Sequence, residues 1–341
     1  MTTALCDPTK TDCLPDRALG MTLDLNFLEK FVADDSPFYL YPGADWTEDG
    51  ITLTIQNETD IPVIVFPRYL FFGRLDLVMH AAPGTGIATV VALVSDDNDE
   101  IDWEFVGADL NHVQSNYIGK GDPFTPDRTK YHDASNITTA WHQYSIDWTP
   151  QSISWLVDGV TMRTLTYTEA KMGTLYPSVE TTSSRSIASS KASRRQTPMQ
   201  CKIYSYVVGK HNASEQDLQW GHGYADLSLA PFTSYIEAAR FQDYMNGETS
   251  AKEYEYTDMS GSFEAISIIP NPSTIIASSY APTSTNPNVQ TSKPAVDSKH
   301  NLNKLNPGAI VGVAVGAVAL IVLGILLFFL IRRRKTAKNR P

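Results

Sequence analysis

The sequence is short of the residues that build disulfide scaffolds, metal centres and basic surfaces. Its 341 residues include 3 cysteines and 7 histidines. Three cysteines are too few for a disulfide scaffold, and the histidines are too scattered for the four ligands of a zinc site, so we expect no metal and no cofactor. The formal net charge is −11, and without an extended basic face this argues against nucleic-acid binding.

The N-terminus lacks a secretory leader, because it has neither a charged segment nor an apolar stretch. Three N-glycosylation sequons nevertheless point to the secretory route, at Asn57, Asn136 and Asn212. We therefore expect secretion, with a leader that is missing from this sequence, and keep a cytosolic protein as the alternative. Gly84 and Gly86 lack the third glycine and the following helix of a dinucleotide loop, which excludes that type of site.

A single long apolar run lies near the C-terminus. Residues 309–331 are 23 apolar or small residues, enough to span a bilayer as a helix. The basic tail 332–341 follows at once and places the C-terminus in the cytoplasm, whereas a lipid-anchor signal would end in its hydrophobic tail. Residues 263–308 are rich in Ser, Thr and Pro and predict an extended linker. We expect a single-pass plasma-membrane protein with an extracellular domain.

Most of the remaining chain alternates short apolar runs with turn residues, which predicts an all-β antiparallel sandwich over residues 21–262. A hairpin turn is predicted at Asp158 and Gly159, and a helical pattern over residues 237–245. Residues 178–195 form a polar, low-complexity insertion that is either a surface loop or a retained intron. The predicted strands are residues 51–55, 69–79 with a bulge at Gly73, 87–94, 113–117, 142–147, 153–157 and 161–166.

The stretch 99–105, DEIDWEF, has the most unusual pattern in the chain. In a β-strand, Glu100, Asp102 and Glu104 share one face, and the apolar residues between them form a core face. Like charges in a row repel one another, so this row destabilises the fold. Such a cost is usually tolerated where chemistry needs the charges. The pattern suits glycosidic bond cleavage by two carboxyl groups, and a solvated acidic edge strand is the alternative.

The spacing of the acids fits a retaining mechanism. The alpha carbons of Glu100 and Glu104 would lie roughly 13 Å apart on a strand. Two long side chains that lean toward each other close much of the gap toward the about 5–5.5 Å that a retaining enzyme requires. Asp102 between them can hold Glu100 by a hydrogen bond, and its charge helps to keep Glu104 protonated.

Residues 85–109, followed by NYIGKG at 116–121, resemble the active-site strand of glycoside hydrolase family 16, and more closely that of the fungal Crh-type cell-wall transglycosylases. The resemblance extends from residue 6 to about 244. It implies a concanavalin-like jelly roll, with Glu100 as nucleophile, Asp102 as helper and Glu104 as general acid/base. It also implies a retaining enzyme with chitinase and glycosyltransferase activity, which cleaves chitin and transfers it to β-glucan or chitin.

The same resemblance implies further site residues. Crh-type enzymes carry a two-cysteine loop near the N-terminus, here residues 1–20, which supports a disulfide between Cys6 and Cys13 and leaves Cys201 over. Family members show a Lys or Arg, a Trp four positions later and then a Thr around the sugar. This chain keeps the cation as Lys202 but has Tyr206 in place of the Trp and Asp217 in place of the Thr. The resemblance implies that these three residues bind substrate together with Glu104. The two altered positions and the insertion keep an alternative open, a catalytically weak or inactive membrane sensor or lectin that binds wall polysaccharide.

Overall fold

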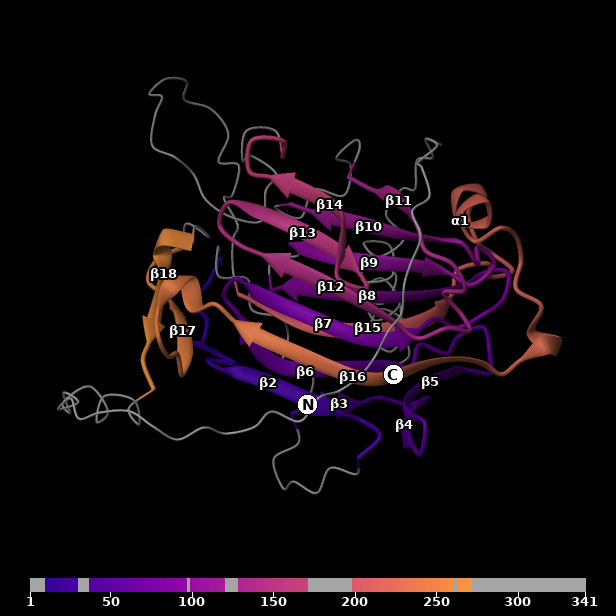
Figure 1. Cartoon of the computed structure of the whole chain (residues 1–341), viewed down its shortest axis with the longest axis horizontal. Coiled ribbons are helices and arrows are strands. Elements are labelled where there is room, and N and C mark those ends of the chain that lie inside the picture. The colour runs from indigo at the N-terminus through magenta and orange to yellow at the C-terminus, as the bar shows by residue number, and fades with distance from the viewer. Residues whose placement is uncertain are drawn as a thin grey trace, which may run out of the picture.

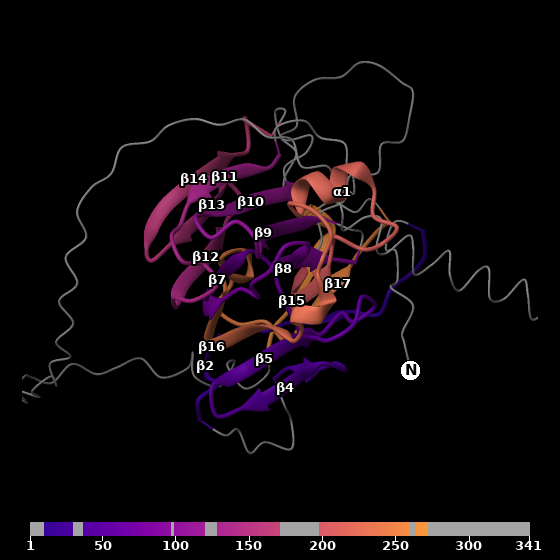
Figure 2. The same ribbon diagram turned by 90° about the vertical axis from the view of Figure 1, so that its right-hand side faces the viewer.

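A computed structural model describes residues 10–29, 37–96, 99–119, 128–170, 198–259 and 263–271. These residues form two large antiparallel sheets that face each other, as Figure 1 shows. The predicted all-β antiparallel sandwich is confirmed. Figure 2 shows the two layers from the side, with β8, β9 and β10 in one and β7, β12 and β13 in the other.

The seven-stranded sheet has the order β11-β10-β9-β8-β15-β6-β3, and β9 lies inside it between β8 and β10. The main path of the eight-stranded sheet is β14-β13-β12-β7-β16-β5-β4, and β2 pairs with β16. The seven-stranded sheet consists of β3 (Tyr39–Leu40), β6 (Val63–Leu70), β8 (Ile87–Ser95), β9 (Glu100–Val106), β10 (His112–Ile118), β11 (Lys130–Asp133) and β15 (Met199–Val207). The other sheet consists of β2 (Thr22–Asn26), β4 (Ala44–Thr47), β5 (Gly50–Ile55), β7 (Gly73–His80), β12 (His142–Trp148), β13 (Ser152–Val157), β14 (Val160–Thr166) and β16 (Phe232–Asp243).

Side chains and hydrogen bonds in the core between the two sheets position β9. Trp103 is fully buried there, and its indole Nε1 donates to the backbone oxygen of Ser145 in the opposite sheet at 3.0 Å. In the reverse direction, Trp155 Nε1 of β13 donates to the backbone oxygen of Asp102 at 3.0 Å. These two hydrogen bonds cross the core and fix the position of β9 relative to the opposite sheet, so the acid-bearing strand has a rigid support.

The turn between β13 and β14 has the predicted residues and conformation. Asp158 has φ 49° and Gly159 has φ 77°. Two successive residues with positive φ are the requirement of a type I′ turn, whose twist matches that of the flanking strands. The hairpin prediction is therefore confirmed.

The prediction of one long strand over residues 69–79 is wrong. β6 ends at Leu70 and β7 begins at Gly73, and the two strands belong to different sheets. Phe72 between them has φ 57°, and both Phe71 and Phe72 are buried in the core. The chain turns a corner here that places two consecutive rings inside, whereas a continuing strand would have pointed one of them outward.

The predicted helix over residues 237–245 is also wrong, because most of this segment belongs to β16. The register of β16 against β7 shifts between Ile236 and Ala238. A bulge of this kind adds one residue to the strand, so the buried positions no longer alternate strictly and resemble a helical period. The described α-helix is instead α1 (Glu215–Trp220), with Ser214 as its N-cap.

A third, small sheet joins the two ends of the domain. It consists of β1 (Asp16–Arg17), β17 (Glu253–Tyr256) and β18 (Ile266–Ile269) in the order β1-β17-β18. The buried Asp243 carboxylate attaches it to the sandwich, since it accepts from the Gly20 amide at 2.8 Å and from the Tyr254 hydroxyl. Strands β1 and β18 therefore lie beyond the predicted boundaries at 20/21 and at 262/263, and both pair with β17. The domain bounds themselves stay a prediction.

Several predicted features lie outside the described residues. These are the insertion 178–195, most of the linker 263–308, the span 309–331, the basic tail 332–341 and Cys6. Within the described ranges, no helix combines the length and the apolar character needed to cross a membrane. Cys201 is a buried free cysteine. The disulfide between Cys6 and Cys13 stays a prediction.

Candidate active site

The three acids of β9 share the face that points away from the sandwich core. Their strand neighbours Ile101, Trp103 and Phe105 are part of the hydrophobic core, so strand alternation places Glu100, Asp102 and Glu104 opposite. The acids are deeply buried all the same, with exposed fractions of 4%, 0% and 7%. The structure therefore brings the predicted trio together on one face.

Asp102 is oriented by a chain of hydrogen bonds through Asn116 of β10 and Thr129, the residue before β11. Asn116 pairs with Asp102 in the β9–β10 register, and its Nδ2 donates to Asp102 Oδ2 at 3.0 Å. Thr129 Oγ1 donates in turn to Asn116 Oδ1 at 3.2 Å. The amide is thereby held with its donor toward the carboxylate, which limits the side-chain freedom of the central acid.

Burial raises the pKa of all three carboxyl groups, and repulsion between carboxylates raises the pKa of Glu100 and Asp102 further. The pKa of Glu100 rises to about 8, first through burial and then through the charge of Glu104. Burial raises the pKa of Glu104 to about 7, and Arg128 acts in the opposite direction. The pKa of Asp102 is raised well above its usual range by burial, followed by the charges of Glu104 and Glu100. The trio therefore keeps protons near neutral pH, as a general acid requires.

The order of these pKa values does not match the roles implied by the family resemblance. A nucleophile must be ionised and a general acid protonated, yet the pKa of Glu100 lies above that of Glu104. Three acids that interact this closely release their protons as a set. The assignment of nucleophile and acid therefore rests on the resemblance and not on electrostatics.

One residue of β8 separates each of two acids from a residue of β15. In register, the predicted substrate residue Lys202 pairs with Ala92, which pairs with Asp102, and Tyr204 pairs with Val90, which pairs with Glu104. Paired residues point to the same face of a sheet. Burial lowers the pKa of Lys202, and the negative charges of Asp96 and Glu100 act in the opposite direction. Lys202 thus lies on the acid face.

Tyr206 also lies on this face, within a second hydrophobic cluster on the outer side of the sheet. The cluster contains Tyr206 and small side chains of β8, and Tyr204 and Trp220 pack against it. The rings of Tyr204 and Tyr206 are tilted by 34° with centroids 6.0 Å apart. Tyr206 is buried, whereas Tyr204 and Trp220 are partly exposed beside the carboxyl groups, so these two rings form the kind of surface on which sugar rings stack.

Asp217 has a local structural role. It is the third residue of α1 and forms a capping box with Ser214, whose Oγ donates to Asp217 Oδ2 at 2.8 Å. Its charge still reaches the site, because it contributes to the raised pKa of Tyr206. The predicted contact of Asp217 with substrate stays a prediction.

The acid face contains buried polar atoms that have no hydrogen-bond partner among the described residues. Buried polar groups in proteins are normally paired, so such a concentration calls for an explanation. A carbohydrate carries many hydroxyl groups that can donate and accept in these positions. The atoms are Glu100 Oε1, Asp102 Oδ1, Gln114 Oε1, Arg128 Nη1, the hydroxyls of Tyr204 and Tyr206, and Trp220 Nε1.

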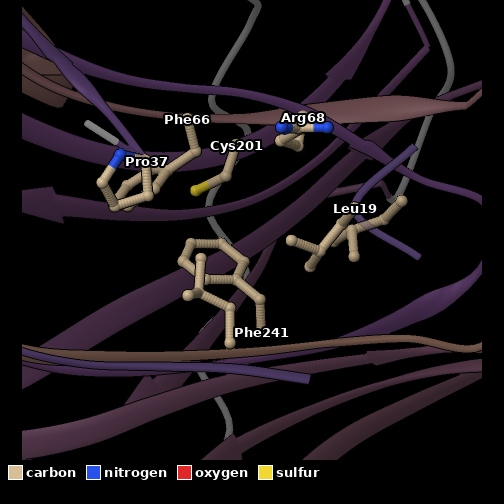
Figure 3. Close-up of a pocket in the computed structure, with 8 residues that line it drawn as sticks. Leu19, Pro37, Phe66, Arg68, Cys201 and Phe241 are labelled. Atoms are coloured by element: carbon tan, nitrogen blue, oxygen red, sulfur yellow. The ribbon is translucent and has the colours of Figure 1, made fainter. Parts of the chain in front are cut away.

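A small cavity elsewhere in the sandwich, drawn in Figure 3, does not belong to this face. Phe66, Cys201 and Phe241 are among its lining residues, and all three are part of the core. Cys201 precedes Lys202 on β15, so the two side chains point to opposite sides of the sheet. The cavity is therefore a gap in core packing behind the acid face.

The three sequons are all accessible. All three asparagines are exposed: Asn57 and Asn136 lie in a bend and a turn between strands, and Asn212 lies in a turn between β15 and α1. These positions suit N-glycosylation, which stays a prediction. The part of the chain that the structure describes contains no cluster of three or more His, Cys, Asp or Glu side chains arranged to hold a metal ion.

Comparison with known proteins decides the family. Residues 40–217 match the glycosyl hydrolases family 16. Crh-like protein 3 of Aspergillus fumigatus is 34% identical over 335 residues, which cover 97% of this chain and 82% of that protein. Crh-like protein 5 of the same species is 34% identical over 261 residues, which cover 76% of this chain and 60% of that protein. This chain belongs to glycosyl hydrolase family 16, as a fungal Crh-type member.

Solved structures agree with the Crh-type assignment. The apo form of a Crh5 transglycosylase superposes with a TM-score of 0.67 at 34% identity, covering 77% of this chain and 100% of that one. The same enzyme in complex with NAG gives a TM-score of 0.67 at 33% identity, with the same coverage.

Several residues of the Crh-type site were not identified from the sequence. Arg128 is buried, and its charge lowers the pKa of all three acids, yet it lies in no recognisable motif. Gln114 and Tyr131 occupy positions in register with Glu104, and Tyr204 does so on the other side. Asn116 begins the segment 116–121 that resembles the family, but the resemblance does not imply its bond to Asp102. The available signal was strand alternation, which cannot be used across strands until their register is known.

Proposed function

We propose that this Crh-type chain is a retaining glycosidase and transglycosylase of the cell wall, which cleaves chitin and transfers it to β-glucan or chitin. The observation that carries the proposal is the acid trio: three carboxyl groups on one face of one strand, with raised pKa values that leave protons available near neutral pH. Such an arrangement is costly for folding and is suited to acid–base chemistry on a glycosidic bond.

In the proposed mechanism the two glutamates divide the work. Glu100 attacks the anomeric carbon, while Glu104 gives its proton to the departing oxygen. Glu104 then takes a proton from the acceptor, which is water in hydrolysis and a sugar hydroxyl in transfer. Asp102, held by Asn116, lies between them, so its charge influences where the protons reside.

The proposed substrate is supported by the relatives and by the side chains of the acid face. A Crh5 structure is a complex with NAG, and NAG is the sugar unit of chitin. On this chain, Lys202, Tyr206 and Trp220 supply a cation and aromatic rings beside the acids. These groups suit a chain of pyranose rings with polar substituents.

We further propose that the enzyme acts at the outer face of the plasma membrane. The exposed sequons and the apolar stretch 309–331 favour this location. A fusion of the full chain, preceded by a secretory leader, to a fluorescent protein at its C-terminus tests the orientation when intact cells are treated with protease. The sandwich should be cleaved from outside and the C-terminal tag protected.

Substitution of Glu104 tests the mechanism. Glu104→Gln should lower the rates of both hydrolysis and transfer by about 10²- to 10⁴-fold, because general acid–base catalysis contributes this much. Fluorescent chito-oligosaccharides incubated with β-glucan report both reactions through the lengths of their products. The exposed Glu248→Gln is the matched control, and it should behave like the wild type.

The outcome also separates the enzyme from a wall sensor or lectin. If the wild-type chain binds the oligosaccharides but never changes their length, the sensor interpretation replaces the enzyme. If Glu104→Gln retains wild-type rates, the assignment of Glu104 is wrong even though the chain is an enzyme.

A further inference from the structure

Two residues flank the acid trio on the side away from Lys202 and Tyr206. In the antiparallel registers, Glu104 of β9 pairs with Gln114 of β10, and Gln114 pairs with Tyr131 of β11. Directly paired residues on neighbouring strands point to the same face of a sheet. Glu104, Gln114 and Tyr131 therefore form one row across three strands of the acid face.

The neighbour of Tyr131 confirms this orientation. His132 points into the core, where its Nε2 lies 2.8 Å from Ser115 Oγ and its ring centroid 5.8 Å from that of Trp103. Alternation along β11 then turns Tyr131 to the opposite side, toward the acids. Burial raises the pKa of Tyr131 and the charge of Glu104 raises it further, as expected for a hydroxyl close to that carboxylate.

Neither side chain is used by the fold in the usual way. Gln114 is 3% exposed, and its Oε1 has no hydrogen-bond partner among the described residues. An unmatched buried carbonyl is unfavourable, and a hydroxyl of a ligand can match it. Tyr131 is 37% exposed, so its ring presents a surface on which a sugar can stack. The buried acceptor Gln114 Oε1 and the exposed ring of Tyr131 therefore form a surface next to Glu104 that can bind a sugar.

The position of this row decides which sugar it binds. In the sheet order, β15 lies two strands from β9 on one side, and β11 lies two strands from β9 on the other, each about 10 Å away. The substrate residues implied by family resemblance, Lys202 and Tyr206, are on β15. With the glycosyl donor bound by these residues, the chain on the opposite side of the reacting carbon is the leaving or accepting one.

We propose that Gln114 and Tyr131 form an acceptor subsite, which binds the polysaccharide whose hydroxyl receives the glycosyl group. The inference rests on the proposed function and extends it. In the transfer step, the ester bond between Glu100 and the anomeric carbon breaks, and a bond forms between that carbon and the acceptor oxygen. The hydroxyl proton passes to Glu104. An acceptor held by Gln114 and Tyr131 displaces water from the same position, so occupancy of the subsite sets the ratio of transfer to hydrolysis.

Two substitutions test the subsite in the full chain. Tyr131→Ala removes the ring, and Gln114→Met removes the amide with little change in volume. With a chito-oligosaccharide donor and a fluorescently labelled β-glucan oligosaccharide as acceptor, each should raise the acceptor KM and lower the ratio of transfer to hydrolysis by about tenfold, the effect of one lost ring contact or hydrogen bond. Tyr131→Phe keeps the ring and should retain most of the ratio.

Trp141→Ala is the matched control, since Trp141 is an aromatic residue with 42% exposure that precedes β12 of the other sheet. It should leave the ratio at the wild-type value, and melting temperatures verify that all variants fold. An unchanged ratio and acceptor KM in both Tyr131→Ala and Gln114→Met overturn the subsite.

Failure of the proposed function gives a different result, because then the wild type itself forms no product. In that case calorimetric titration with the same β-glucan oligosaccharide decides. Weaker binding by Tyr131→Ala supports the subsite, and equal binding by wild type and variant overturns it.

Discussion

The two faces of the seven-stranded sheet treat buried polar groups in opposite ways. Toward the core, polar side chains of this sheet have partners: Trp103 Nε1 donates to the Ser145 oxygen, and Ser205 Oγ lies 3.0 Å from both Thr89 Oγ1 and Ser234 Oγ. The hydroxyl of Tyr144, which enters the core from the opposite sheet, is an exception. On the acid face, polar atoms of comparable burial, such as Tyr206 OH, have no partner among the described residues. The core face is optimised for stability, while the acid face keeps hydrogen-bonding capacity for a ligand.

Charge separates the faces as strongly as hydrogen bonding does. Strand β9 carries its apolar side chains inward and its acids outward, so one seven-residue strand serves both faces. The acids destabilise the fold, because burial and repulsion disfavour their ionised forms. The core side of the same strand offsets that cost. The electrostatic cost of the acids therefore falls on a strand whose opposite side chains are fully buried in the core.

The largest expected effect comes from the core side of β9. Trp103→Ala removes a fully buried indole together with its cross-sheet hydrogen bond, and should lower the free energy of unfolding by about 3–5 kcal/mol. Urea denaturation measures this. Tyr206→Phe on the other face removes only a hydroxyl without a partner, and should leave the free energy of unfolding unchanged or slightly higher. Equal losses in the two variants would contradict the contrast between the faces.

The contrast between the faces also explains what the sequence could predict. The alternation of acids and apolar residues along β9 is local, so Glu100, Asp102 and Glu104 were predicted together and the structure places them together. Gln114 and Tyr131 reach Glu104 through strand pairing, across 10 and 27 residues of sequence. No local pattern contains such a pairing. The row of acids could be predicted from the sequence alone, whereas the residues around it could be identified only once the strand register was known.

The errors in predicting elements have the same origin. The corner at Phe72 and the bulge near Ile236 are features in which tertiary packing departs from regular alternation. Both segments were apolar and β-favouring or weakly periodic, so the pattern alone could not place the break. Strands β7 and β13 follow the alternation of buried and partly buried residues, and strands of this kind made the fold class predictable despite the two wrong elements.

The second prediction concerns the cost of the acid face and its dependence on pH. The pKa values of Glu100 and Glu104 in the folded protein, about 8 and about 7, lie above the ordinary value of 4.5. Between these limits the folded state binds more protons than the unfolded state, so the free energy of unfolding should fall as the pH rises from about 5 to about 8. Glu104→Gln removes one carboxyl and its repulsion of Glu100, and should flatten this fall.

We expect Glu104→Gln to be more stable than the wild type at about pH 8, by on the order of 1–3 kcal/mol, and nearly equal at about pH 5. Urea denaturation across this range is the measurement. Glu248→Gln, at an exposed position, should follow the wild-type curve. A Glu104→Gln curve parallel to the wild type would show that the acid face does not carry the proposed electrostatic cost.

The smallest expected effects test the polar contacts that the acid face does make. The chain from Thr129 Oγ1 to Asn116 Oδ1, and from Asn116 Nδ2 to Asp102 Oδ2, has lengths of 3.2 and 3.0 Å. Asn116→Ala removes the donor to Asp102 and should lower kcat about tenfold, the effect of one lost bond to a charged group. Thr129→Val keeps the shape and only frees the amide to rotate, so about a two- to threefold loss is expected.

The two substitutions should not be additive. Thr129 acts on Asp102 only through Asn116, so Thr129→Val should have no further effect on kcat once Asn116 is alanine. Because the Asn116 bond lowers the pKa of Asp102, Asn116→Ala should also move the acidic limb of the pH–rate profile to higher pH, which a loss of stability alone would not do. If Thr129→Val lowers kcat by the same factor in both backgrounds, Thr129 acts on the site by another route, and the central acid is not positioned by this chain of hydrogen bonds.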